Sequence, residues 1–253
     1  MPNSRSNPCK STTPSSRLAR CRSIGELRDT LVHLLQDAAI ESPRRTAELL
    51  LCHVLGCSPL ELVLQRNEAL PSAALKQLIR LLHRRLRHEP LQYVLGETEF
   101  FGLRLRIWRG VFIPRPETEL LVEEALALIP PEAPVRVLDI GTGSGCIALA
   151  IAHHRPAARV LGIDISESAL RLARFNARRL GLRTVQFVRC DILREIPAGA
   201  PFHIIAANPP YIPADDFPGL QPEVRLFEPR EALTDGADGL RFYRRFLELF
   251  PLL

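Results

Sequence analysis

VRVLDIGTGSG, residues 135–145, is the stretch of sequence that decides the fold. A short apolar run ends in Asp139 and Ile140, and glycines then occupy every second position up to Gly145. Such a run is typical of a buried strand, and glycine lets the chain turn tightly and lets a ligand approach the backbone. The stretch therefore predicts a strand, a ligand-binding turn and the start of a helix.

Strand and helix patterns alternate from Val135 onward. This alternation predicts a doubly wound α/β domain with a parallel sheet. Strands are expected at residues 135–140, 160–163, 185–188 and 202–206, and helices at 120–128, 146–152, 169–180 and 240–253.

Two acids follow the next two strands of this domain. Asp164 is placed to accept hydrogen bonds from the two hydroxyls of a ribose, and Asp191 is placed to lie near an adenine amino group. Each residue taken singly is equally well explained as a helix N-cap. Together with the glycine turn, they mark three successive strand ends that face one ligand. The spacing Gly-x-Gly-x-Gly differs from the dinucleotide pattern, which makes a pyrophosphate the weaker candidate.

The fourth strand is followed by Asn208, Pro209, Pro210 and Tyr211. Two prolines remove two backbone donors and leave carbonyl groups free to accept hydrogen bonds from another molecule. Asn208 adds an amide oxygen as acceptor, and Tyr211 adds an aromatic face. The alternative is a rigid turn with a capping asparagine.

Residues 24–90 show the periodicity of a small helical bundle. Ser23 and Glu26 form a capping box before the first helix, while Pro43 and Pro71 precede two further helices. The last helix is rich in arginine, which fits either a solvated face or a docking surface for an anionic partner. Its arginines are Arg80, Arg84, Arg85 and Arg87.

Two segments flank the bundle. Residues 1–23 are basic and serine-rich without an acid, which predicts a disordered tail or, alternatively, an organelle transit peptide. Residues 91–113 alternate like strands and predict a hairpin linker, with Phe100, Leu103, Leu105 and Ile107 as its buried positions.

The composition excludes several classes of protein. The chain of 253 residues is 46% apolar and 24% charged, and no apolar run is long enough for a membrane span. Its six cysteines include no Cys-x-x-Cys pair, so we expect neither a metal site nor a disulfide framework, and a reducing compartment fits best. The net charge of +5 leaves an acidic partner open.

The motifs, taken together, resemble a known family. The glycine turn, the ribose acid and Asn-Pro-Pro-Tyr are similar to those of class I S-adenosylmethionine-dependent methyltransferases, which have a Rossmann-like fold. Residues 113–119 (IPRPETE), the Phe-Phe-Gly segment at 100–102, and residues 208–239 resemble the HemK family, the release factor glutamine methyltransferases. The likeness covers roughly residues 24–250.

The resemblance implies a function and a set of site residues. It implies methylation of the side-chain amide nitrogen of the glutamine in the Gly-Gly-Gln motif of peptide chain release factors. Asn208, Pro209 and Tyr211 are the expected catalytic residues, and Pro210 joins them in holding the substrate. S-adenosyl-L-methionine is expected to contact Gly141, Thr142, Gly143, Ser144, Gly145, Asp164, Asp191, Ile192 and Asn208. Ile192 departs from the aromatic residue that some members place beside the adenine.

The resemblance also implies the organisation of the chain. Residues 24–90 are expected to be a substrate-recognition domain and residues 114–253 the methyltransferase domain. The family fold has seven strands and the sequence predicts four, so we expect the C-terminal strands to be missing and the fourth strand to form an edge. We further expect a cytoplasmic monomer without a membrane or nucleic-acid partner.

Three other functions remain open at this stage. The first is methylation of a ribosomal-protein glutamine, and the second is methylation of a nucleic-acid base. The helical bundle offers no aromatic platform for stacking bases, which weighs against the second. The third is an inactive, truncated module that only binds its partner.

Overall fold

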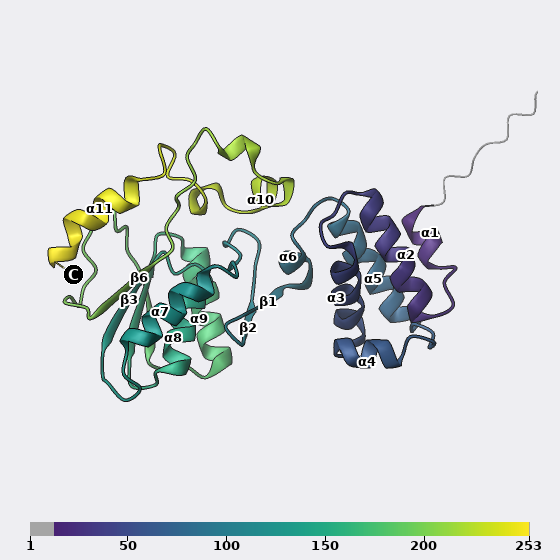
Figure 1. Cartoon of the computed structure of the whole chain (residues 1–253), viewed down its shortest axis with the longest axis horizontal. Helices are drawn as coiled ribbons and strands as arrows, with labels where there is room; N and C mark the ends of the chain where they lie inside the picture. The colour runs from purple at the N-terminus through teal and green to yellow at the C-terminus, as the bar shows by residue number, and fades with distance from the viewer. Residues whose placement is uncertain (1–12, 253) are drawn as a thin grey trace, which may run out of the picture. The chain divides into compact units, whose positions relative to one another are not determined.

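The computed structural model describes residues 13–252 (Figure 1). This part of the chain divides into two compact units, with the boundary between Leu95 and Gly96. The N-terminal unit is helical, and the C-terminal unit carries a parallel sheet. The predicted fold class is therefore confirmed. Within the described residues, no helix is both long and apolar enough to cross a membrane.

The N-terminal unit is a helical bundle, as predicted. Its helices are α1 (Pro14–Leu18), α2 (Ile24–Asp37), α3 (Pro43–Leu55), α4 (Pro59–Leu64), α5 (Ser72–Arg85) and α6 (Leu91–Leu95). Helix α3 packs against both α2 and α5 (Figure 1). Leucines at helical spacing fill the space between these helices, among them the fully buried Leu31, Leu35, Leu50, Leu51, Leu78 and Leu82.

Helix α1 corrects the prediction of a disordered tail over residues 1–23. The Thr13 side chain caps the helix by accepting a hydrogen bond from the Ser16 amide, and Pro14 supplies a favourable first-turn residue. Leu18 is fully buried in the core of the bundle. A capped turn with one apolar anchor is enough to order this segment, although it is too short to show periodicity. Residues 1–12 of the predicted tail lie outside the described residues.

The helix caps differ in part from those predicted. The Ser23 hydroxyl accepts from the Glu26 amide, but the Glu26 carboxylate accepts from the Arg22 amide instead of that of Ser23. The complete capping box belongs to α4, where Ser58 and Glu61 each accept from the other's backbone amide. The sequence Ser58-x-x-Glu61 carries the capping-box pattern, but α4 has only 6 residues, too few to show the apolar periodicity of a helix.

Two arginines of α5 have an internal structural role. The Arg84 guanidinium pairs with the Glu89 carboxylate and donates to the carbonyl oxygens of Tyr93 and Val94 at 2.8 and 3.1 Å. Arg85 is buried and donates to the Glu89 carbonyl at 2.9 Å. Arg85 is therefore not part of a solvated face, and the two residues join α5 to Glu89 and to α6. Whether this helix also contacts an anionic partner stays a prediction.

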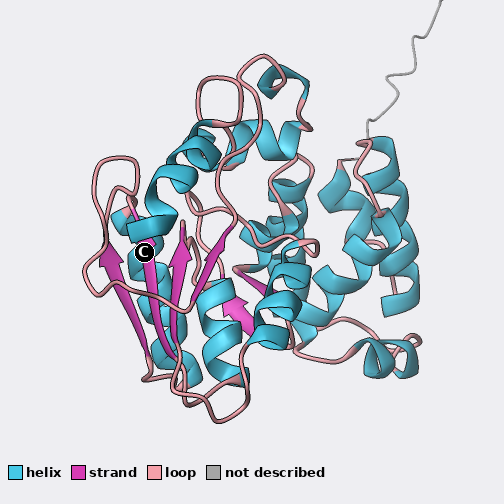
Figure 2. Cartoon of the chain, turned by 60° about the vertical axis from the view of Figure 1, so that its left-hand side comes forward, coloured by secondary structure: helices cyan, strands magenta, loops and turns pink. Residues whose placement is uncertain are grey.

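The C-terminal unit is built on a sheet of four parallel strands. Figure 2 shows the strands side by side, and their order in the sheet is β5-β4-β3-β6. These are β3 (Arg136–Ile140), β4 (Arg159–Asp164), β5 (Val185–Arg189) and β6 (Ile204–Ala207). Each lies within one or two residues of its predicted range. Among the described strands, β6 pairs only with β3, so it forms an edge of the sheet, as expected.

Helices cover both faces of this sheet. Helices α7 (Thr118–Leu128), α8 (Cys146–His154) and α9 (Glu167–Leu180) pack on the face that carries Val137, and α11 (Arg241–Leu249) packs on the face that carries Leu138. Neighbouring residues of a strand point to opposite faces of the sheet. Because helices cover both faces, Val137 on one side of β3 and Leu138 on the other are both buried. The remaining elements are α10 (Pro222–Phe227) and three short 3₁₀ helices at Phe217–Gly219, Arg230–Ala232 and Phe250–Leu252.

The predicted hairpin consists of β1 (Glu97–Phe100) and β2 (Leu103–Arg106), which pair in antiparallel fashion. All four positions that the sequence predicts to be buried are buried, namely Phe100, Leu103, Leu105 and Ile107. The first three join the core beneath α7 and α8. The hairpin therefore packs as part of the C-terminal unit, and residues 91–95 before it are helical.

The docking of α1 can be tested by truncating its anchor. Leu18→Ala should lower the free energy of unfolding by about 2 kcal/mol, because it leaves a cavity under a fully buried side chain. Leu60→Ala is the matched control, since Leu60 is 70% exposed, and it should change the value by less than about 0.5 kcal/mol. Urea unfolding followed by circular dichroism measures both. Equal effects of the two substitutions would show that α1 is not docked.

Candidate functional site

A cavity of about 380 Å³ lies at the carboxyl ends of β3, β4, β5 and β6. Its size is within the range of small-molecule sites, and its position is the usual ligand position in a doubly wound sheet. The strand ends form its floor, and two further segments, at residues 110–118 and 229–242, supply other walls. All of these residues belong to the C-terminal unit.

The glycine turn forms one wall of the cavity. The amides of Gly141 and Thr142 both donate to the Ile163 carbonyl at 2.9 Å, which fixes the turn to the end of β4. Gly141 has a φ of 72° and open space where a side chain would stand, so a ligand can lie against its backbone. Residues 141–144 line the cavity.

Gly145 differs from the other predicted turn residues because it does not line the cavity. A side chain at this position would come within 3.0 to 3.2 Å of Leu149, Ala173 and Phe187. The glycine therefore allows α8 to approach its neighbours closely. Its contribution to a ligand site is indirect, through the position of α8.

Asp164 lies against the glycine turn. Its carboxylate accepts hydrogen bonds from the Gly143 amide at 2.9 Å and from the Ser166 amide at 2.8 Å. Burial raises the pKa of this carboxyl group above its usual value. The N-cap of α9 is Ser166, so the alternative in which Asp164 caps this helix is wrong. Each carboxylate oxygen can still accept a second hydrogen bond from a ligand.

Asp139 is a buried acid behind the turn. One of its oxygens, Oδ2, accepts from the Thr142 hydroxyl at 2.6 Å and from the Ala148 amide at 3.2 Å, which holds the turn and the first residues of α8 together. Burial raises the pKa of Asp139 to about 7, and the nearby Asp164 adds to this rise. Within the described part of the chain, Asp139 Oδ1 has no hydrogen-bond partner.

Asp191 and Ile192 lie on the side of the cavity that follows β5. Asp191 accepts from the Leu193 amide at 3.1 Å and pairs with Arg194 at 3.3 Å. Ile192 is buried and offers an apolar surface to the cavity, while its carbonyl accepts from Arg245 of α11 at 3.0 Å. The residues that follow β5 thus line the same cavity as those that follow β3 and β4, as the sequence predicts.

The segment after β6 brings Asn208, Pro209 and Pro210 to the cavity. The Asn208 side-chain Nδ2 donates to the Thr118 hydroxyl at 3.1 Å. Tyr211 is 57% exposed and does not line the cavity. The structure therefore combines Asn208 to Pro210 with the glycine turn, and leaves the Tyr211 side chain at the surface.

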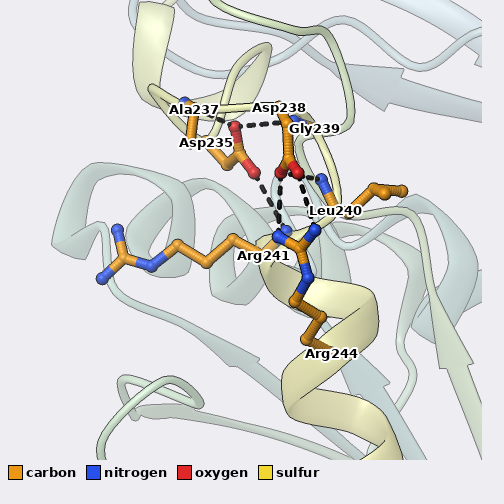
Figure 3. A network of polar contacts seen from close by, with 7 residues as sticks. All are labelled: Asp235, Ala237, Asp238, Gly239, Leu240, Arg241 and Arg244. Atoms are coloured by element: carbon orange, nitrogen blue, oxygen red, sulfur yellow. Dashed lines mark hydrogen bonds and ion pairs between the residues drawn. The ribbon is translucent and has the colours of Figure 1, made fainter.

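A loop after Thr234 supports the backbone at Tyr211. Gly239 lies so close to the Tyr211 carbonyl that a side chain at 239 would come within 2.3 Å of its oxygen. Figure 3 shows how the loop is held: Asp235 accepts from three backbone amides, and Asp238 pairs with Arg244. The Arg244 guanidinium lowers the pKa of Asp238. This loop and the start of α11 form one ordered support.

Sequence reasoning missed the wall at residues 110–118. Its backbone is held by Glu228, a buried acid that accepts from the Ile113 amide at 3.1 Å and pairs with the Arg115 guanidinium. Val111, Phe112, Pro114 and Thr118 of this segment line the cavity. The available signal was the pair of prolines at 114 and 116, which stiffen the entry to α7 but do not reveal what it faces.

Comparison with known proteins agrees with this arrangement. The PrmC N-terminal domain model matches residues 26–96, and a methyltransferase domain model matches residues 131–233. Three relatives named release factor glutamine methyltransferase are 41%, 44% and 45% identical to this chain. They come from Thermodesulfovibrio yellowstonii, Geobacter sulfurreducens and Burkholderia pseudomallei.

Each match covers most of this chain and most of the relative. They span 81%, 86% and 85% of this chain, and 73%, 75% and 76% of the respective relatives. Identity at this level over both units, one of which is the family's own N-terminal domain, is far more specific than a shared sheet topology. The chain belongs to the release factor glutamine methyltransferase family.

Proposed function

We propose that this chain transfers the methyl group of S-adenosyl-L-methionine to the side-chain amide nitrogen of the glutamine in the Gly-Gly-Gln motif of a peptide chain release factor. Membership of the family supports the reaction. The observation that carries the assignment of residues is that the glycine turn, Asp164 and Asn208 line a single cavity. The proposed substrate acts in translation termination, which makes the cytoplasm the expected compartment.

The residues of the cavity fit the cofactor. The open backbone at Gly141 leaves room for a ligand, and the remaining acceptor capacity of Asp164 suits the two ribose hydroxyls. Ile163 and Ile192 offer an apolar surface for the adenine, beside Asp191. When bound, S-adenosyl-L-methionine supplies a methyl group on a positively charged sulfur, which is a strong electrophile.

The segment after β6 suits the amide substrate. An amide nitrogen is a weak nucleophile because its lone pair is delocalised into the carbonyl. We assign Asn208 Oδ1 and the Pro209 carbonyl as acceptors for its two N–H groups, which would orient the nitrogen and stabilise the positive charge that develops on it. The new C–N bond would form as the methyl carbon–sulfur bond breaks, with the sulfur keeping the electron pair and leaving as a neutral thioether. The methylated nitrogen would then carry an acidic proton that can leave without a strong base.

Tyr211 completes the proposed substrate site from the outside. Its ring is largely exposed at the end of the Asn-Pro-Pro-Tyr segment, while its backbone is fixed by the contact with Gly239. The Tyr211 ring would pack against the plane of a bound glutamine amide, and this contact would exclude water from the reacting nitrogen.

Asn208→Ala tests the assignment of the acceptor. Loss of the acceptor should reduce methyl transfer by about 100-fold or more, because it removes stabilisation of the charge on the nitrogen. The affinity for S-adenosyl-L-methionine should change by less than about 3-fold, since Asp164 and the glycine turn remain. Peptide mass spectrometry of the release factor measures transfer, and calorimetry measures binding. An equal loss in both would count against the assigned role.

Asp164→Ala provides the complementary test of the cofactor site. It removes hydrogen bonds from a carboxylate to the ligand, so the affinity for S-adenosyl-L-methionine should fall by about 10- to 100-fold. Because burial raises the pKa of Asp164, binding to the wild-type protein should also weaken as the pH falls and the carboxylate is protonated. Calorimetric titration at several pH values measures both effects. Unchanged affinity in the variant would remove Asp164 from the site.

A further inference from the structure

Asn208 is held by a residue from a distant part of the sequence. Thr118 is the first residue of α7, and its hydroxyl accepts a hydrogen bond from Asn208 Nδ2 at 3.1 Å. Thr118 is only 7% exposed, and both residues line the cavity. The two residues are separated by 90 positions in the chain.

The orientation of the Asn208 amide decides whether it can act as an acceptor. An asparagine side chain presents an oxygen on one side and an NH₂ group on the other. If the NH₂ group faced the substrate nitrogen, two donors would meet and the contact would be repulsive. With Nδ2 bonded to Thr118, Oδ1 is the group left to accept. The hydrogen bond at Nδ2 also polarises the amide and makes Oδ1 a better acceptor.

Thr118 itself is fixed in place by the protein. Its amide donates to the Arg115 carbonyl at 3.0 Å, and Arg115 is paired with the buried Glu228. Glu228 also accepts from the Ile113 amide, so the turn before α7 is held on both sides of Pro114. A connected set of contacts thus runs from Glu228 through this turn to Thr118 and Asn208.

We propose that Thr118 is a positioning residue for methyl transfer, which holds the Asn208 side chain with its oxygen toward the reacting nitrogen. This inference rests on the proposed role of Asn208 as the acceptor. Thr118 acts through Asn208 and needs no contact with the substrate. Its hydroxyl is the functional group, and its methyl group contributes only to packing.

Thr118→Val and Thr118→Ser separate these two parts of the side chain. Valine keeps the shape and removes the hydroxyl, so kcat for methylation of the release factor should fall by about 10-fold. Serine keeps the hydroxyl, and its kcat should stay within about 3-fold of the wild-type value. In both variants the affinity for S-adenosyl-L-methionine and the unfolding midpoint should match those of the wild type. Thr46→Val, at a buried threonine in the N-terminal unit, is the matched control and should leave kcat unchanged.

A double-mutant cycle shows whether Thr118 acts through Asn208. Thr118→Val should cause no further loss of transfer when Asn208 is already alanine, measured as residual methylation by mass spectrometry after long incubation. A wild-type kcat in Thr118→Val, with Asn208→Ala inactive, would overturn the inference and leave the proposed function intact. Full activity of Asn208→Ala would overturn the proposed role of Asn208 itself. A serine variant as impaired as the valine variant would also overturn the inference, because it would indicate a packing role.

Discussion

The parallel pairing of β3 with β4 is the constraint on which the site depends. Ile140, the last residue of β3, lies opposite Ile163, and β4 ends one residue later at Asp164. The Ile163 carbonyl then accepts the first two amides of the glycine turn, and Asp164, the next residue, accepts from Gly143. The register of one strand pair therefore places the turn and the acid against each other.

The opposite side of the cavity depends on contacts between segments far apart in the sequence. Glu228 holds the turn at residues 113–115, and Thr118 holds Asn208. Burying Glu228 is costly unless its oxygens are satisfied, and the Ile113 amide and the Arg115 guanidinium satisfy them. The two sides are thus built differently. Hydrogen bonds of backbone amides at neighbouring strand ends hold the glycine turn against Asp164, whereas side-chain contacts between distant segments hold Asn208 and the turn before α7.

This difference explains how much could be predicted from the sequence. The strands, the glycine turn and Asp164 follow from apolar runs and from residues at strand ends, which are local patterns. The internal role of Arg84 and the wall held by Glu228 depend on partners that no periodicity specifies. Leu18 was missed for a related reason, because one apolar residue gives no period and gains its burial only from the bundle.

The same difference bears on how the two halves of the site can vary. Gly141 lines the cavity and has open space where a side chain would stand, so its place in the site depends on glycine conformation and on strand register. Asn208 presents a side-chain amide whose orientation depends on a hydroxyl at the start of α7. A change in the turn before α7 can therefore reach Asn208 through Thr118. The residues proposed to bind the cofactor and those proposed to hold the substrate amide are thus fixed by largely separate sets of contacts around one cavity.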